Sequence, residues 1–170
     1  DQISICATKK DADLINYAAM EKLTGNPVQY IADYEGVISD ADLQVETSMI
    51  LKVGMRVMSV VNGIGYSNGS HGTVVSLDQS YVEVLFDNNW KVCFGKRNFT
   101  VDRRDIPGKT TDVWQIPIRP AYAITIHKSQ GQTFQYVNID GTRCWAPGQL
   151  YVAVSRARKI EGIHFLTPIK

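Results

Sequence analysis

The pattern that most limits the fold of this 170-residue chain is an alternation of strand and helix signals at both of its ends. Residues 3–7 are a short β-type run, and apolar side chains then recur at helical spacing until Gly25 and Pro27 stop the helix. Toward the C-terminus, residues 136–140 alternate as a strand, a helix follows, and residues 163–166 form a last strand. Strands that alternate with helices predict a largely parallel sheet covered on both faces. The apolar positions of the first helix are Leu14, Ile15, Ala18, Ala19 and Leu23.

Thr8 marks the predicted start of this first helix. Threonine is a favoured N-cap residue, and Asp11, three positions on, completes a spacing like that of a capping box. On this interpretation Thr8 is a cap, and Asn16 on the same helix makes a surface or buried polar contact. A binding role for either residue remains an open alternative.

Between the two α/β ends, five short β-type runs occupy a stretch of about 50 residues. The breaks between them are turn-forming sequences, among them residues 68–69, 78–80 and 87–89. Such regular short strands predict a small antiparallel barrel. Residues 35–47 are polar and fit either a loop or a short helix. The five runs are residues 56–61, 72–77, 81–86, 90–94 and 98–101.

Composition excludes several classes of protein. The chain is 44% hydrophobic and 21% charged, which is ordinary for a soluble globular protein, and it has neither a membrane-length apolar run nor a signal peptide. Its net charge of +1 means that any basic groove is local. Cys6, Cys93 and Cys144 are far apart and lack CxxC spacing, which favours free thiols in a reducing, cytoplasmic compartment over disulfides or a metal site.

Two polar segments near the C-terminus carry the chemistry. Residues 123–134 (AITIHKSQGQTF) concentrate hydrogen-bonding side chains on one short element, and residues 149–158 (QLYVAVSRAR) place two arginines after an apolar run. Residues 121–130 have helix-compatible composition, so Pro120 is expected to open a helix that ends at Gly131. Taken singly, a glycine after a polar helix end is usually a C-cap, and arginines after an apolar run are usually a solvated helix end.

Together, in this order and spacing, the two segments resemble motifs V and VI of superfamily-one helicases. The sequences IHKSQGQTF and LYVAVSRAR are similar to the corresponding motifs of the RecD/Pif-type branch. The resemblance is strong over residues 115–166. It implies an α/β fold, a RecA-like (P-loop NTPase-type) motor domain formed by residues 1–51 and 106–170. An SH3-like β-barrel would be inserted at residues 52–105. A chain that opens directly in a strand is also expected to be a piece of a longer protein.

The resemblance implies a role for each polar residue. Arg156 stands at the position of the arginine finger, which contacts the γ-phosphate. Thr133 departs from the family, since many motor proteins carry a more acidic residue there. The residues expected to face the DNA backbone are Thr125, His127, Lys128 and Ser129, joined by Thr8 and Asn16 on the first strand–helix unit. Those expected at the nucleotide are Gln130, Gly131, Gln132, Thr133 and Ser155.

Two further patterns do not support a separate site. Gly108-Lys109-Thr110 is not a phosphate-binding loop, because Arg103 stands where its first glycine is required. A basic cluster formed by Lys91, Lys96, Arg97, Arg103 and Arg104 has Trp90 and Phe94 interleaved. We interpret it as a solvated barrel face rather than as a nucleic-acid surface.

The expected function is therefore the C-terminal half of an ATP-dependent 5′-to-3′ DNA helicase, similar to the RecD (exodeoxyribonuclease V alpha) proteins of DNA repair and recombination. Its expected partners are single-stranded DNA and the N-terminal RecA-like domain of the same parent, which is expected to be of bacterial or phage origin, with no membrane. ATP and Mg²⁺ would bind to the full-length protein, and this chain alone, which lacks Walker A and B sequences, should be inactive. A non-enzymatic single-stranded nucleic-acid-binding module and an RNA helicase fragment remain alternatives.

Overall fold

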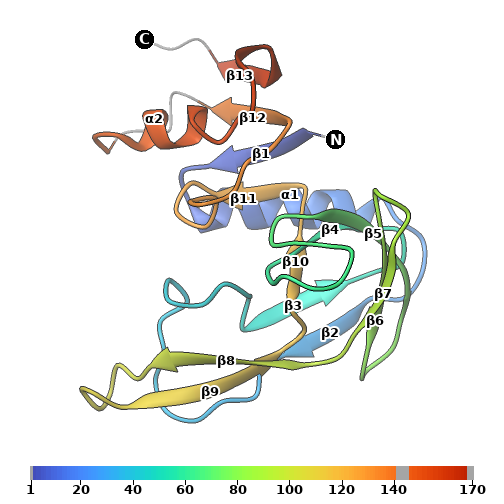
Figure 1. The fold of residues 1–170 in the computed structure, drawn as a ribbon, viewed down its shortest axis with the longest axis vertical. Coiled ribbons are helices and arrows are strands. Elements are labelled where there is room, and N and C mark those ends of the chain that lie inside the picture. Colours follow the sequence, from blue (N-terminus) through green and yellow to red (C-terminus); the bar gives the residue numbers. More distant parts are fainter. Residues whose placement is uncertain (1, 141–145, 168–170) are drawn as a thin grey trace. The chain divides into compact units, whose positions relative to one another are not determined.

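A computed structural model describes residues 2–140 and 146–167 and divides the chain into two compact units (Figure 1). The smaller unit comprises the described residues up to Lys22 and from Pro120 onward, and the larger unit is Leu23–Arg119. The predicted domain limits differ from this division and stay a prediction. No helix in the described residues is long and apolar enough to cross a membrane.

The smaller unit is built on a four-stranded parallel sheet in the order β11-β1-β12-β13. Its strands pair across long sequence separations, so that Ile5 lies between Ile124 and Ile139. The parallel sheet of the α/β prediction is therefore confirmed. Its elements are β1 (Gln2–Cys6), α1 (Lys9–Glu21), β11 (Ala123–Thr125), β12 (Tyr136–Asp140), α2 (Gln149–Val154), a 3₁₀ turn (Ile160–Gly162) and β13 (Ile163–Thr167).

Helix α1 begins as predicted. The Thr8 hydroxyl oxygen accepts a hydrogen bond from the Asp11 backbone N–H at 3.2 Å, and the hydroxyl in turn donates to the Asp11 carboxylate at 2.6 Å. The helix buries Ala12 and Met20, whereas Leu14 on the expected apolar face is 59% exposed. The cap is therefore confirmed, but the expected apolar face is only partly buried.

The helix predicted at residues 121–130 is wrong. Residues Ala123–Thr125 form strand β11, paired parallel to β1, and a series of turns follows up to Gly131. Ala123 and Ile124 are both 3% exposed. Burial beside β1 outweighs the local helix preference, which is a weak prior for so short a segment.

The larger unit is made of β-strands. Its main sheet has five strands in the order β10-β4-β5-β6-β7, antiparallel from β4 to β7, and two further antiparallel pairs are β2-β3 and β8-β9. Its strands are β2 (Val28–Ile31), β3 (Ser48–Leu51), β4 (Arg56–Ser59), β5 (His71–Leu77), β6 (Val82–Phe86), β7 (Lys91–Phe94), β8 (Arg97–Asp102), β9 (Thr110–Gln115) and β10 (Ile118–Pro120).

All five predicted β-runs are strands, within one or two residues at most ends. The fifth run, β8, pairs with β9 in a separate hairpin, and β10 supplies the fifth strand of the main sheet. Strands β3, β9 and β10 were not predicted. The SH3-like character of this unit stays a prediction.

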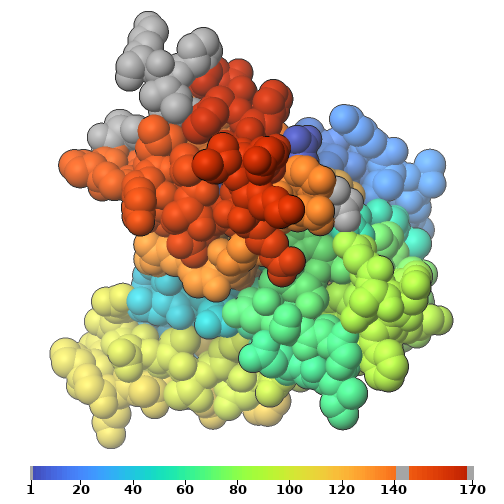
Figure 2. Space-filling model, turned by 45° about the horizontal axis from the view of Figure 1, so that its top comes forward, coloured from blue at the N-terminus to red at the C-terminus, as the bar shows by residue number. Residues whose placement is uncertain are grey.

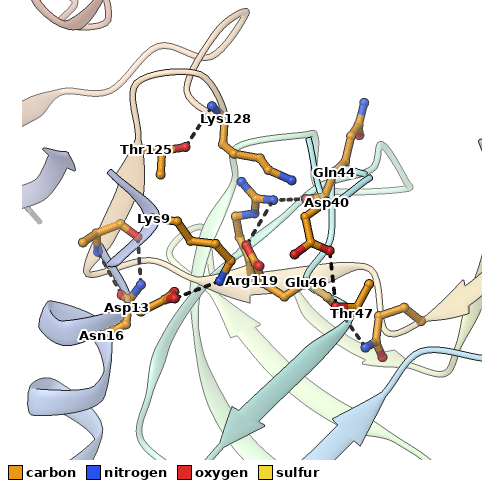
Figure 3. A network of polar contacts seen from close by, with 12 residues as sticks. Lys9, Asp13, Asn16, Asp40, Gln44, Glu46, Thr47, Arg119, Thr125 and Lys128 are labelled. Atoms are coloured by element: carbon orange, nitrogen blue, oxygen red, sulfur yellow. Dashed lines mark hydrogen bonds and ion pairs between the residues drawn. The ribbon is translucent and has the colours of Figure 1, made fainter. Parts of the chain in front are cut away.

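Residues 35–47, left open between loop and helix, form an irregular segment with turns and no helix. Leu43 and Val45 are nevertheless almost fully buried. The buried Gln115 amide donates to the backbone carbonyls of Tyr30 and Glu46, and the buried Arg119 donates to that of Gln44 (Figure 3). Side chains far along the chain thus fix a segment that looks featureless in sequence.

Candidate functional site

The candidate site lies at the carboxyl ends of two neighbouring parallel strands. Cys6 of β1 lies opposite Thr125 of β11, and the Ile126 N–H donates to the Cys6 carbonyl at 2.9 Å. Thr8 and the turn after β11 therefore share one edge of the sheet. In open α/β sheets, ligands bind outside this edge.

The turn after β11 presents two basic side chains. The Thr125 hydroxyl accepts a hydrogen bond from the Lys128 N–H at 3.2 Å (Figure 3), and the Ser129 N–H donates to the Thr125 carbonyl at 2.9 Å. His127 is exposed and Lys128 is half-buried. A turn fixed by its own hydrogen bonds can present such groups to an anion with little loss of conformational entropy.

Ser129 does not lie at the surface. It is 0% exposed, and its hydroxyl donates to the Ile126 carbonyl at 2.7 Å. In this conformation Ser129 stabilises the turn instead of facing a ligand.

Asn16 joins α1 to the first residue of β11. Its side-chain amide donates to the Ala123 carbonyl at 3.0 Å and accepts from the Ala123 N–H at 2.9 Å. Figure 3 shows Asn16 at this position on α1. Both hydrogen-bonding ends of the amide are engaged, and the Thr8 hydroxyl is engaged by the helix cap. For both residues the structure shows the polar contacts of the structural interpretation, and a binding role stays a prediction.

Arg156 is held by acceptors from both polar segments. Its Nε donates to the Val152 carbonyl at 3.2 Å, Nη1 to the Gln132 carbonyl at 3.2 Å, and Nη2 to the Ser155 hydroxyl at 3.0 Å. A backbone hydrogen bond also joins the two segments: the Phe134 N–H donates to the Arg156 carbonyl at 2.8 Å. The two segments predicted to act together therefore lie side by side.

The remaining predicted nucleotide residues lie on the chain that leaves the turn. Gln130, Gly131 and Thr133 are exposed, whereas Gln132 is half-buried beside Arg156. Gly131 has a φ of +78°, a left-handed conformation that favours glycine. Of these four residues, Gln132 contacts Arg156, and the other three adjoin it along the chain.

Sequence reasoning missed two cations at the start of α1. Lys9 forms an ion pair with Asp13 at 2.8 Å (Figure 3), and Lys10 beside it is exposed. Both follow Thr8 directly, so they lie at the same edge of the sheet as His127 and Lys128. Their position immediately after the end of a predicted strand is the sequence signal that could have indicated them as site residues.

The basic cluster of the larger unit is mostly neutralised. Four of its members form ion pairs: Lys91 with Glu83, Lys96 with Asp33, Arg103 with Asp105, and Arg104 with Asp42. The Arg103 guanidinium holds the pKa of the Asp105 carboxyl well below its usual range. These pairs support a solvated face. Within the described ranges, Arg97 is the one member of this cluster with no ion pair.

Comparison with known proteins gives the class of this fold. The model of the UvrD-like helicase C-terminal domain matches residues 120–160, which include both polar segments. The unliganded Pif1 structure from Bacteroides sp. is similar over 100% of this chain and 41% of its own length, with a TM-score of 0.82 and 32% identity. The fold is therefore that of a RecA-like helicase domain.

Two curated relatives are helicases of the same kind as this solved structure. The ATP-dependent DNA helicase Pif1 of Bdellovibrio bacteriovorus is 35% identical over 144 residues, which are 78% of this chain and 32% of that protein. Human PIF1 is 30% identical over 181 residues, covering 95% of this chain and 26% of that protein. The chain thus spans about a third or less of the curated relatives it matches. It belongs to the superfamily-one helicases of the Pif1/RecD-type branch, and it corresponds to their C-terminal half.

Proposed function

We propose that this chain is the C-terminal motor half of an ATP-dependent DNA helicase that moves 5′ to 3′ on single-stranded DNA. The observation that carries the proposal is the contact between the two polar segments, in which Arg156 on one donates to the Gln132 carbonyl on the other. One segment offers basic groups at the sheet edge, and the other holds an arginine beside it. This arrangement suits a domain that links strand binding to nucleotide hydrolysis.

At the DNA side, His127 and Lys128 are the proposed contacts, supported by Thr125, with Lys10 as an added cation. Contacts to phosphates position a strand without reading its sequence, as translocation requires. The Pif1 of Bacteroides has been solved bound to single-stranded DNA, which supports this assignment. Asn16, Thr8 and Ser129 are proposed to act indirectly, by holding the turn.

At the nucleotide side, Arg156 is the proposed arginine finger, with Ser155 and residues 130–133 beside it. The same Bacteroides protein has been solved in complex with ADP-AlF4. ATP, with Mg²⁺, would supply the phosphoryl group, and a guanidinium at its γ-phosphate stabilises charge in the transition state. Such a finger contributes about 10³–10⁵ in rate. To reach a phosphate, Arg156 must exchange its present acceptors for phosphate oxygens.

The other elements of ATP hydrolysis would come from a first motor domain of the same parent. The phosphate-binding loop and the acidic pair that holds the metal are absent from the sequence of this chain. We therefore propose that the chain by itself binds DNA but does not hydrolyse ATP. Residues 52–105, which lie within the larger unit, are proposed to be the SH3-like insertion of the RecD/Pif-type branch.

The test is ATP hydrolysis, with and without single-stranded DNA, by this chain and by a longer version that includes the first motor domain. We expect no turnover from the short chain, and DNA-stimulated turnover from the longer one that Arg156→Ala lowers at least about 10³-fold. Lys109→Ala, an exposed change remote in sequence from both segments, serves as the matched control.

Four results would contradict the proposal or part of it. Hydrolysis by the short chain alone would mean that it contains a complete site. A longer protein that binds DNA but remains inert would favour the non-enzymatic binding module. Equal affinity for RNA and DNA strands of one length would favour an RNA helicase, and affinity independent of salt would exclude phosphate contacts.

A further inference from the structure

A groove in the larger unit is not used by the proposed function. It has a volume of about 320 Å³ and lies between strand β8 and residues 42–44 of the irregular segment. In the space-filling view this segment, in blue-cyan, borders the yellow hairpin that contains β8 (Figure 2). The volume is at the lower end of the range for ligand sites in proteins.

One wall of the groove is formed by an edge strand. Among the described residues, β8 pairs with β9 on one side only, and its sheet has just these two strands. Residues 97–101 of this edge strand line the groove. An edge strand carries backbone N–H and C=O groups that are free to pair, so it can accept one more extended chain.

The floor of the groove is apolar. Phe99 and Val101, two residues apart on β8, share one side of the strand and pack with Val61 against the buried Leu43. Side chains of an extended peptide also alternate with a period of two residues. The spacing of this floor therefore matches two apolar side chains at positions i and i+2 of such a peptide.

The charge at one end of the groove is uncompensated. Arg97 is exposed and, within the part of the chain that the structure describes, has no ion-pair partner. At the other side Asp42 is already paired with Arg104 at 2.5 Å. A carboxylate of a bound peptide could pair with Arg97, and Arg–carboxylate pairs are often bidentate.

From these features we infer that the groove binds an extended, acidic and apolar peptide segment of a partner protein, which adds as a strand to β8. A nucleic-acid strand fits less well, because the groove offers a single free cation beside the acidic Asp42, and strand binding depends on several phosphate contacts. The inference does not depend on the helicase activity, since none of the proposed DNA or nucleotide residues lines the groove.

The test uses this chain and a capped, fluorescein-labelled seven-residue peptide in which valine alternates with serine after an initial aspartate. We expect saturable binding, with NMR shift changes at residues 97–101 and 42–44. Arg97→Glu should weaken binding at least about tenfold, and Arg97→Lys should restore part of it, because a charge-assisted pair is lost and then partly regained. Lys109→Glu, the same charge change elsewhere on the β8–β9 hairpin, should have no effect.

Three results would overturn the inference. One is the absence of shift changes at residues 97–101 with millimolar peptide. Another is equal weakening by Arg97→Glu and Lys109→Glu, which would indicate non-specific charge attraction. The third is a seven-nucleotide single-stranded DNA that shifts these residues at lower concentration than the peptide, which would make the groove a nucleic-acid site. ATP hydrolysis by the longer protein should be unchanged by Arg97→Glu in every case.

Discussion

At the scale of single residues, the smaller unit depends on side chains that satisfy buried backbone. Asn16 is the main example, because its amide pairs with both backbone groups of Ala123, a residue that is 3% exposed. Unpaired buried backbone groups cost free energy comparable to a lost hydrogen bond. The amide therefore fixes the start of β11, and through it the turn that carries His127 and Lys128.

Replacing this amide should destabilise the fold. Asn16→Ala removes both hydrogen bonds, and we expect the free energy of unfolding to fall by about 2–3 kcal/mol, with an unchanged m-value in urea. Asp13→Ala on the same helix removes only an exposed ion pair and should cost less than about 1 kcal/mol. If Asn16→Ala instead lowers DNA affinity without loss of stability, Asn16 contacts the strand directly.

His71 makes the larger unit sensitive to acid. Burial, together with the positive charge of Arg56, lowers the pKa of His71 from 6.5 to about 4, although the Asp87 carboxylate opposes this shift. The pKa of the folded state lies below that of the unfolded state, so between these values only the unfolded state binds the proton. Stability is therefore complete above about pH 6.5 and falls as the pH drops to about 4.

The loss over this range should approach about 3 kcal/mol, since one pKa unit corresponds to 1.36 kcal/mol. Urea unfolding at several pH values measures it, followed by the fluorescence of Trp90 and Trp114. His71→Gln cannot titrate and should flatten the curve between pH 6.5 and 4. A curve of the same slope in this variant would assign the acid sensitivity to other groups.

At the scale of elements, sequence patterns predicted most strands, the first helix and its cap, because these depend on residues near one another. The pattern failed at residues 121–130, where pairing with β1 decides the structure. It left residues 35–47 open between a loop and a helix, because this segment is held by the distant Gln115. The candidate site likewise combines features that the sequence predicted with features that it did not. The grouping of Arg156 with Gln132 followed from family resemblance, whereas the burial of Ser129 could not be read from neighbouring residues.

The approach of β13 to β12 requires a glycine. A Cβ at Gly162 would lie 2.1 Å from the Gln135 carbonyl oxygen, so Gly162→Ala forces the backbone apart just before the paired residues Val137 and Ile163. We expect a loss of about 1–3 kcal/mol, the cost typical of overpacking, measured by thermal unfolding. Gly95→Ala has open space around its Cβ and serves as the control. Equal stability of both variants would show that the strands adjust freely.

At the scale of the whole molecule, the smaller unit is assembled from two parts of the chain that the larger unit separates. Asn16 and Ala123 are 107 positions apart, yet they form a pair of hydrogen bonds. The larger unit instead joins strands that are mostly neighbours in sequence, such as β4 to β7. Closing a long loop costs entropy that grows only slowly with its length, so an insertion of this size is compatible with a stable sheet.

The hydrogen bonds that hold Arg156 in this structure also have a consequence for which ligands it can bind. Its present acceptors are two carbonyl oxygens and a hydroxyl, all electrically neutral. The charge of the guanidinium already strengthens each of these hydrogen bonds, but a phosphate oxygen adds the attraction between two opposite charges. A phosphate can therefore draw the guanidinium away, whereas a neutral ligand gains little by the exchange. In the proposed role these three contacts hold the arginine in place until an anionic group such as a phosphate binds beside it.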